Sequence, residues 1–199
     1  MSFFANVKDI ENQVRNAMDG GAVTPYYSLD LERVYEVLNG AIASEIVCIL
    51  RYKQHYFGTT GVHEDALQAV FKEHWEDEEG HLMAISERLR QLGGIPDLNP
   101  KGLADRAFSH FESGRTLADL LREDLLAERV VIKVYGDIVD FFGKADPVTR
   151  RLFEGILKDE EDHADDLADL LYTIDPTTGK AIEVFTGDST FVAYKNNGK

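Results

Sequence analysis

The sequence predicts an all-α protein built around a four-helix bundle. Four long segments repeat apolar side chains every three or four residues, which is the period of an amphipathic helix. Stretches that contain glycine and proline separate these segments. The chain has 199 residues, which is enough for one domain with additional segments at its ends and for a core that needs no disulfide.

An N-terminal extension, residues 1–29, is expected to contain a short helix over about residues 5–18. Gly20 and Gly21 would end that helix, because glycine readily adopts the left-handed conformation found after helix C-termini. The first long helix is then predicted over about residues 30–57, where the apolar stripe begins.

The second long helix is predicted over about residues 64–92, and Gly93 and Pro96 form a strong stop after it. The third begins at Thr116, three residues before Asp119, which is a variant of the capping box with aspartate in place of glutamate. Both ends of the connection between these two helices are therefore marked by local sequence signals.

The fourth helix is predicted to begin at Asp146, followed by Pro147, a residue favoured at the first helical position. The long crossover between helices two and three, roughly residues 93–115, allows the chain to run from one end of the bundle to the other. The bundle is thus expected over residues 30–173. An irregular tail, residues 174–199, follows it and contains two short strand-like runs that predict a weak hairpin or an arm packed on a partner.

The net charge of the chain limits the kinds of molecule that it is expected to bind. The formal net charge is −15, which disfavours binding to nucleic acid or to an anionic membrane and suits the attraction of cations. Cys48 is the only cysteine, so the chain forms no internal disulfide, in keeping with a cytoplasmic location. We expect no signal peptide and no membrane span, since no apolar run approaches the length that a bilayer requires.

Ionisable residues interrupt the apolar stripes of all four long helices. They are Glu45, Glu78, His81, Glu128, Glu160 and His163. Burying an unpaired carboxylate costs several kcal/mol, so four of them require positive charge nearby. Two divalent cations would cancel the four negative charges, and two neutral imidazoles would complete the ligand set. This is the arrangement known for bundles that hold two metal ions, with one glutamate from each of two helices and Glu-x-x-His from each of the other two.

The spacing of these residues indicates an internal repeat. The two glutamates of the first half are 33 residues apart, and those of the second half are 32 apart. In each half a tyrosine follows the first glutamate by seven residues. The two helical hairpins are therefore expected to be related by a pseudo-two-fold axis close to the metals.

Simpler interpretations exist for single residues. A lone Glu-x-x-His motif, or a lone glutamate within an apolar stripe, is more often a boundary residue than a ligand. His74 could contact the site, although lining the bundle is the favoured interpretation. We expect His55, His63 and His110 on the surface or in loops, and Cys48 as a small buried apolar group.

At these motifs the chain resembles the ferritin-like superfamily, and within it the bacterioferritin and Dps-like branch. The run Asp77-Glu78-Glu79-Gly80-His81 is similar to the iron motif on the second helix of that family, and Asp159-Glu160-Glu161-Asp162-His163 repeats it on the fourth. The resemblance covers about residues 30–173. It implies an intrasubunit ferroxidase centre with two iron ions per subunit.

The resemblance also implies a role for each ligand. Glu45 and His81 would hold one metal with Glu78 bridging, while Glu128 and His163 would hold the other with Glu160 bridging.

Tyr52 resembles the tyrosine that lies behind the ligands in this family, and the internal repeat places Tyr135 equivalently. Asp124 resembles the aspartate that orients a ligating histidine, and Glu73 and Asp77 resemble an inner-surface iron site.

One departure bears on cofactors. Bacterioferritin places its haem-ligating methionine directly after the glutamate of the second helix, but here that residue is Glu79. Haem is therefore not expected. The predicted function is oxidation of Fe²⁺ by O₂ or H₂O₂, with the ferric product stored inside a cage of identical subunits.

Two alternatives stay open. The first is a non-storing oxidoreductase or peroxidase that uses two iron or manganese ions on the same bundle. The second is a DNA-protecting structural protein of the Dps type, which the net charge of −15 disfavours.

Overall fold

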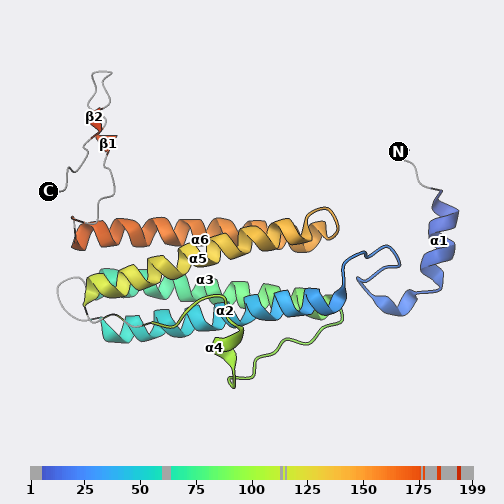
Figure 1. The fold of residues 1–199 in the computed structure, drawn as a ribbon, viewed down its shortest axis with the longest axis horizontal. Helices are drawn as coiled ribbons and strands as arrows, with labels where there is room; N and C mark the ends of the chain where they lie inside the picture. Colours follow the sequence, from blue (N-terminus) through green and yellow to red (C-terminus); the bar gives the residue numbers. More distant parts are fainter. Residues whose placement is uncertain are drawn as a thin grey trace.

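Four long helices lie side by side in the computed structural model and form an elongated bundle (Figure 1). They are α2 Leu31–Gly58, α3 Glu64–Gln91, α5 Leu117–Phe142 and α6 Pro147–Ile174. The structure describes residues 6–59, 64–112, 114, 116–175, 177, 183–184 and 192–193. Helix α2 packs mainly on α3, and α5 mainly on α6, so the bundle consists of two helical hairpins. The predicted all-helical bundle with its long crossover is confirmed.

The predicted helix starts are also found. The Thr116 side chain accepts a hydrogen bond from the Asp119 backbone amide, and the Asp119 side chain accepts one from the Thr116 amide. At α6, Asp146 accepts from the backbone amide of Thr149, and Pro147 occupies the first helical position. Asp30 caps α2 through the amide of Glu32. These side chains satisfy backbone donors that a helix start leaves unpaired.

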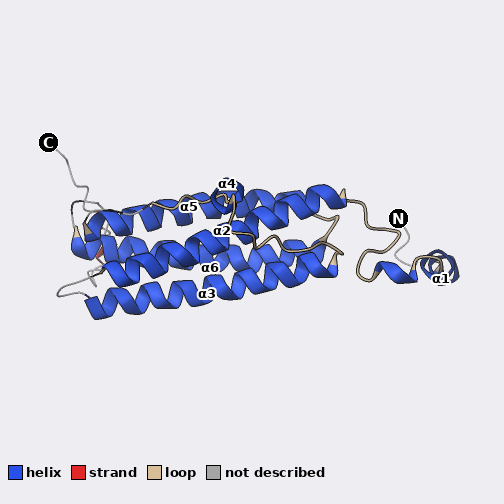
Figure 2. Ribbon diagram, turned by 90° about the horizontal axis from the view of Figure 1, so that it is seen from below, coloured by secondary structure: helices blue, strands red, loops and turns tan. Residues whose placement is uncertain are grey.

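The segments at the ends of the chain are smaller. Helix α1, Val7–Arg15, and a single 3₁₀ turn, Met18–Gly20, lie beyond one end of the bundle and bury none of their residues (Figures 1 and 2). In the tail, β1 (Glu183–Val184) pairs antiparallel with β2 (Val192–Ala193). The remainder of the two strand-like runs lies outside the described residues. The division of the chain at residues 29 and 173 stays a prediction.

The crossover between α3 and α5 is docked on α2. It contains the short helix α4, Leu103–Arg106, and its Phe108 ring lies so close to Gly40 that a Cβ there would fall 2.4 Å from the ring. The Ser44 hydroxyl accepts a hydrogen bond from the Phe108 amide at 2.7 Å and donates one to the Gly40 carbonyl at 2.9 Å. A glycine on α2 thus allows the crossover to pack directly against the helix.

The apolar core consists of two clusters with a polar layer between them. The larger includes Leu38 and Ile42 of α2 together with Phe153 of α6, and the smaller includes Phe71 of α3 and Leu167 of α6. The six ionisable residues singled out above are distributed over the four helices. Along each helix they lie between the residues that belong to one cluster and those that belong to the other. The apolar clusters therefore close off the polar layer at both ends. None of the described helices combines the length and the hydropathy of a membrane span.

Candidate metal centre

The polar layer brings together all six predicted ligands. Each of the four long helices contributes at least one of them, and the relative exposure of every one of these residues is 7% or less. Two of these helices, α3 and α6, present a glutamate and a histidine three residues apart on the same face, as the helical period requires. The four buried carboxylates therefore lie within one small volume.

The ligand atoms form two overlapping groups. One group contains Glu45 and His81, the other contains Glu128 and His163, and both contain Glu78 and Glu160. Within each group one donor atom per residue lies within 4.8 Å of the others. Glu78 and Glu160 are thus the two residues placed to bridge a pair of metal ions.

Several donor atoms in this layer are buried without a hydrogen-bond partner among the described residues. They are Glu78 Oε1, Glu128 Oε2, both carboxylate oxygens of Glu160, and His163 Nδ1. A buried carboxylate oxygen without a donor is costly, whereas a divalent cation would satisfy it. The donor set of carboxylate oxygens and imidazole nitrogens suits iron, manganese or zinc.

Each of the two histidines is oriented by an aspartate from the opposite half of the repeat. His81 directs Nδ1 toward Glu78 and Glu160, at 3.3 and 3.4 Å, while its Nε2 lies 3.3 Å from Asp159 Oδ2. His163 likewise directs Nδ1 toward the glutamates, and its Nε2 lies 3.3 Å from Asp77 Oδ2. Such partners fix the ring orientation of a metal-binding histidine.

This geometry corrects the role expected for Asp124. That carboxylate does not contact either histidine of the two groups; it accepts hydrogen bonds from Arg51 Nε at 2.8 Å and lies 2.7 Å from His55 Nδ1. His55 is buried at 1% exposure, so its expected place on the surface was wrong. The aspartates that face the two histidines instead directly precede the glutamates of the Glu-x-x-His motifs.

Two buried tyrosines lie behind the outer glutamates, as predicted. The Tyr52 hydroxyl donates to Glu128 Oε1, and the Tyr135 hydroxyl donates to Glu45 Oε1. Each tyrosine belongs to the opposite hairpin from the glutamate that it contacts. Each hydrogen bond therefore links the two hairpins and occupies one oxygen of a terminal carboxylate, while the other oxygen is left for a metal.

A buried arginine is the main feature that the sequence analysis missed. Arg51 is fully buried and pairs with Asp124 at 2.8 Å and with Glu128 at 3.2 Å. It also donates to Ser109 Oγ at 3.0 Å and to the His110 carbonyl at 3.1 Å, both in the crossover. The signal was available, since Arg51 lies next to Tyr52 on the buried stripe of its helix.

The protonation of the layer depends on burial and on the crowded carboxylates. Burial raises the pKa of Glu45 and Glu128 well above the ordinary carboxyl value, and the neighbouring glutamates raise it further. Burial lowers the pKa of His163, but Glu160 and Glu78 outweigh this effect and raise it to about 11. Protons thus balance the negative charge in the metal-free layer, and a bound cation must displace them.

The remaining histidines and the cysteine have mostly structural positions. His74 is buried and stacks on His163 with a ring distance of 4.1 Å, so it contacts the polar layer, which was the less favoured of its two interpretations. Burial and the neighbouring His163 lower the pKa of His74 to about 3, so its ring is neutral. Cys48 is buried and His110 is exposed, both as expected, whereas His63 lies outside the described residues.

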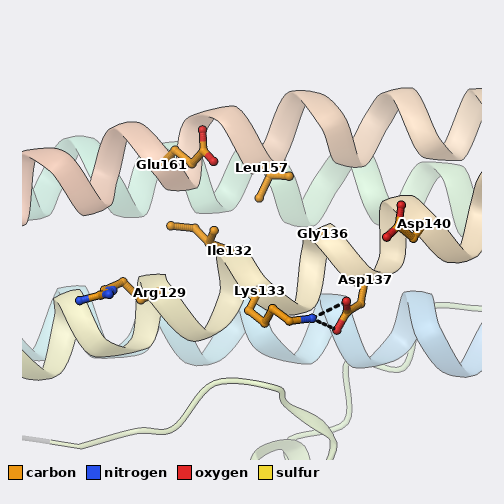
Figure 3. A pocket seen from close by; sticks show the side chains of 8 residues that line it. All are labelled: Arg129, Ile132, Lys133, Gly136, Asp137, Asp140, Leu157 and Glu161. Atoms are coloured by element: carbon orange, nitrogen blue, oxygen red, sulfur yellow. Dashed lines mark hydrogen bonds and ion pairs between the residues drawn. The ribbon is translucent and has the colours of Figure 1, made fainter.

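A separate surface groove runs between α5 and α6, with a volume of about 580 Å³ (Figure 3). Arg129, Lys133 and Asp137 line one side of it, and Lys133 forms an ion pair with Asp137. Glu161 lies on the other side, on α6. None of the six residues of the polar layer lines this groove, so the candidate metal centre is internal to the bundle.

The chain is similar to proteins of known families. The model of the ferritin-like domain matches residues 35–176. A nutrient stress-induced DNA-binding protein from Synechococcus is 33% identical over 144 residues, covering 70% of this chain and 81% of that protein. A bacterioferritin from Mycolicibacterium paratuberculosis is 32% identical over 148 residues, covering 71% and 86%.

Solved structures show the same fold. The bacterioferritin-related protein of Bacteroides fragilis, described as a dodecameric thioferritin, is 26% identical, with a TM-score of 0.71 over 86% of this chain and 96% of that one. Dps from Thermosynechococcus elongatus has a TM-score of 0.67 at 22% identity, over 70% of this chain and 90% of its own. From the match of the family model and of these relatives, the chain belongs to the ferritin-like family.

Proposed function

We propose that this protein is a ferroxidase that binds two Fe²⁺ ions per subunit at the buried layer and oxidises them with O₂ or H₂O₂. The observation that carries the proposal is the pair of overlapping ligand groups, which share Glu78 and Glu160. Glu45 and His81 complete one metal position; Glu128 and His163 complete the other. In this proposal haem is absent and iron is the native metal.

The charges and the electrons of this reaction balance. The four glutamates supply −4 and two ferrous ions supply +4, while the buried Arg51 is paired with Asp124. Each Fe²⁺ loses one electron, and the two electrons reduce H₂O₂ to water or O₂ to H₂O₂. Hard carboxylate oxygens favour the ferric product, and the apolar clusters on both sides exclude bulk water.

Storage of the ferric product requires an enclosed space, so the proposal includes a hollow assembly of identical subunits. Closed symmetric assembly is the common outcome for soluble homo-oligomers. A structural relative that is 26% identical is described as dodecameric, which supports self-association here. The mass of the purified protein in solution tests this part, and a monomer or dimer at all concentrations would remove the storage claim.

The central claim is tested by rapid oxidation kinetics. Metal-free protein is loaded anaerobically with two Fe²⁺ per subunit and mixed with O₂ or H₂O₂, while ferric absorbance is followed. Glu78→Ala and Glu160→Ala should each abolish the fast phase, because either change removes a ligand shared by both metals. Glu87→Ala is the control, since Glu87 is exposed and pairs with the neighbouring Arg90 on the surface. Fast oxidation in both bridging variants, folded by circular dichroism, would refute the assignment.

Two other functions are separated from this one by simple measurements. A non-storing enzyme with two iron or manganese ions would retain only the ions of its own site after iron loading, whereas a storage protein would retain a large excess. A role in DNA binding is suggested by the name of the Synechococcus relative, a nutrient stress-induced DNA-binding protein. The acidic charge of this chain opposes that role. A cytoplasmic location, expected from the single cysteine, stays a prediction.

A further inference from the structure

We propose that the two metal positions are unequal, and that Arg51 makes the Glu128 and His163 position the weaker one, so that the Glu45 and His81 position fills first. The inference rests on the proposed two-metal centre and adds an order of binding to it. Arg51 acts here as a positioning residue, since it contacts a ligand carboxylate rather than the metal.

Arg51 is held in place on several sides. Its Nη2 donates to Glu128 Oε1 at 3.2 Å, and its Nε donates to Asp124. Its Nη1 donates to the Ser109 hydroxyl and to the His110 carbonyl, so two residues of the crossover anchor the guanidinium. A guanidinium with this many partners cannot swing away when a cation binds nearby.

The internal repeat supplies a direct comparison. Glu45 and Glu128 are equivalent and lie 83 residues apart, as do Tyr52 and Tyr135. The same separation places Val134 opposite Arg51 and Ala41 opposite Asp124, the carboxylate that pairs with Arg51. His55, which contacts Asp124, corresponds to Ile138. Glu128 therefore lies beside a buried charged cluster, whereas the equivalent positions around Glu45 carry apolar side chains.

This difference changes the strength of the two terminal carboxylates as ligands. Glu128 Oε1 accepts from both Arg51 and Tyr52, whereas Glu45 Oε1 accepts from Tyr135. Each donor withdraws negative charge from the carboxylate, and a charged donor withdraws more than a hydroxyl. Asp124 cancels the charge of Arg51 overall. Within this pair, however, it is the Arg51 guanidinium that forms an ion pair with Glu128. The cation held by Glu128 thus meets a weaker ligand and a nearby positive charge.

The experiment uses Co²⁺ as the probe, because its binding is visible in the absorption spectrum and requires no oxidation. Metal-free full-length protein is titrated with Co²⁺, and the two dissociation constants are fitted. We expect two ions per subunit, with dissociation constants that differ at least tenfold, a common effect of a residue that contacts a metal ligand. Glu45→Gln should remove the tighter step and Glu128→Gln the weaker one.

A charge-neutral double variant tests the cause. Arg51→Met combined with Asp124→Asn removes the buried pair without leaving an unpaired charge, and it should tighten the weaker step about tenfold. The control is Lys53→Met with Glu79→Gln, which removes an exposed ion pair between the same two kinds of group and should leave both constants unchanged.

The outcomes separate this inference from the proposed function. Two Co²⁺ ions bound with equal constants, a double variant with an unchanged ratio, or a weaker step lost with Glu45→Gln would each overturn the inference while leaving the two-metal centre intact. Failure to bind two ions at all would overturn both. The wild-type titration and the two glutamine variants decide the order of binding even if the double variant does not fold.

Discussion

His81 and Asp159 face each other across α3 and α6, with His81 Nε2 3.3 Å from Asp159 Oδ2, and the repeat forms the same contact between His163 and Asp77. In each motif the aspartate directly precedes the glutamate that both ligand groups share, but the histidine that it contacts belongs to the other motif. The two Asp-Glu-x-x-His motifs therefore orient one another, which explains why both Nδ1 atoms point toward the shared glutamates.

Loss of either aspartate should weaken metal binding. Asp77→Asn and Asp159→Asn keep the size of the side chain but reduce its ability to hold the imidazole N–H, so each should weaken one Co²⁺ step about tenfold. Asp77→Asn should weaken binding of the metal held by His163, and Asp159→Asn should weaken binding of the metal held by His81. Calorimetric or spectroscopic titration measures the effect. Asp162→Asn is the control, because Asp162 is exposed and pairs with Lys158. Unchanged constants in both variants would show that the contacts do not support the ligands.

Metal binding should stabilise the fold, because the cations satisfy carboxylate oxygens that are buried without a hydrogen-bond partner among the described residues. At a free metal concentration 1,000 times the dissociation constant, the gain for a bound ion is about 4 kcal/mol. Thermal unfolding of the metal-free protein with added Co²⁺ measures it. Glu160→Gln should lose most of this gain, since Glu160 belongs to both groups. Each gain is measured against the metal-free form of the same protein, so that any effect of the substitution on the metal-free fold is subtracted. An equal gain with Co²⁺ in Glu160→Gln and in the wild type would contradict this account.

The start of α6 should make stability depend on pH in acid. Burial raises the pKa of Asp146, but hydrogen bonds from Thr149 and Arg88 outweigh this and lower its pKa below the ordinary 3.8. A carboxylate with a lowered pKa contributes its full stability above the ordinary value and loses it as the pH falls through the folded value. The free energy of unfolding should therefore fall more steeply below about pH 4 in the wild type than in Asp146→Asn.

At pH 7 the same variant should cost about 3 kcal/mol, since it leaves the largely buried Arg88 without its charged partner. Urea unfolding at several pH values gives both quantities. Asp137→Asn removes an exposed ion pair with Lys133 and should cost less than about 1 kcal/mol. Parallel pH curves for wild type and Asp146→Asn would show that Asp146 is not the titrating group.

Binding to DNA should be weak or absent, in contrast to the property named for the Synechococcus relative. Neutralising phosphates requires a basic surface, and the chain carries a net charge of −15. A DNA fragment should migrate unchanged with the protein at physiological salt in the presence of a chelator. Retardation under those conditions would favour the DNA-protecting function.

The sequence by itself determined the helices and the six residues of the polar layer. Both follow from local rules: apolar periodicity defines the buried face of each helix, and the caps at Thr116 and Asp146 mark where two of them begin. A carboxylate on a buried face requires compensation wherever its helix packs. The interruptions of the apolar stripes at Glu45, Glu78, Glu128 and Glu160 could therefore be identified without coordinates, and the structure brings these residues together.

Only the tertiary structure decided which side chains meet across helices. Asp124 was expected to orient one of the histidines of the layer, but the packing of α5 on α2 directs it to Arg51 and His55. Asp77 and Asp159, which are partly exposed, reach those histidines instead. Helical period reports the face on which a residue lies, whereas the partner on that face depends on the rotation and offset of the neighbouring helix, and these are set by the packing of the whole core.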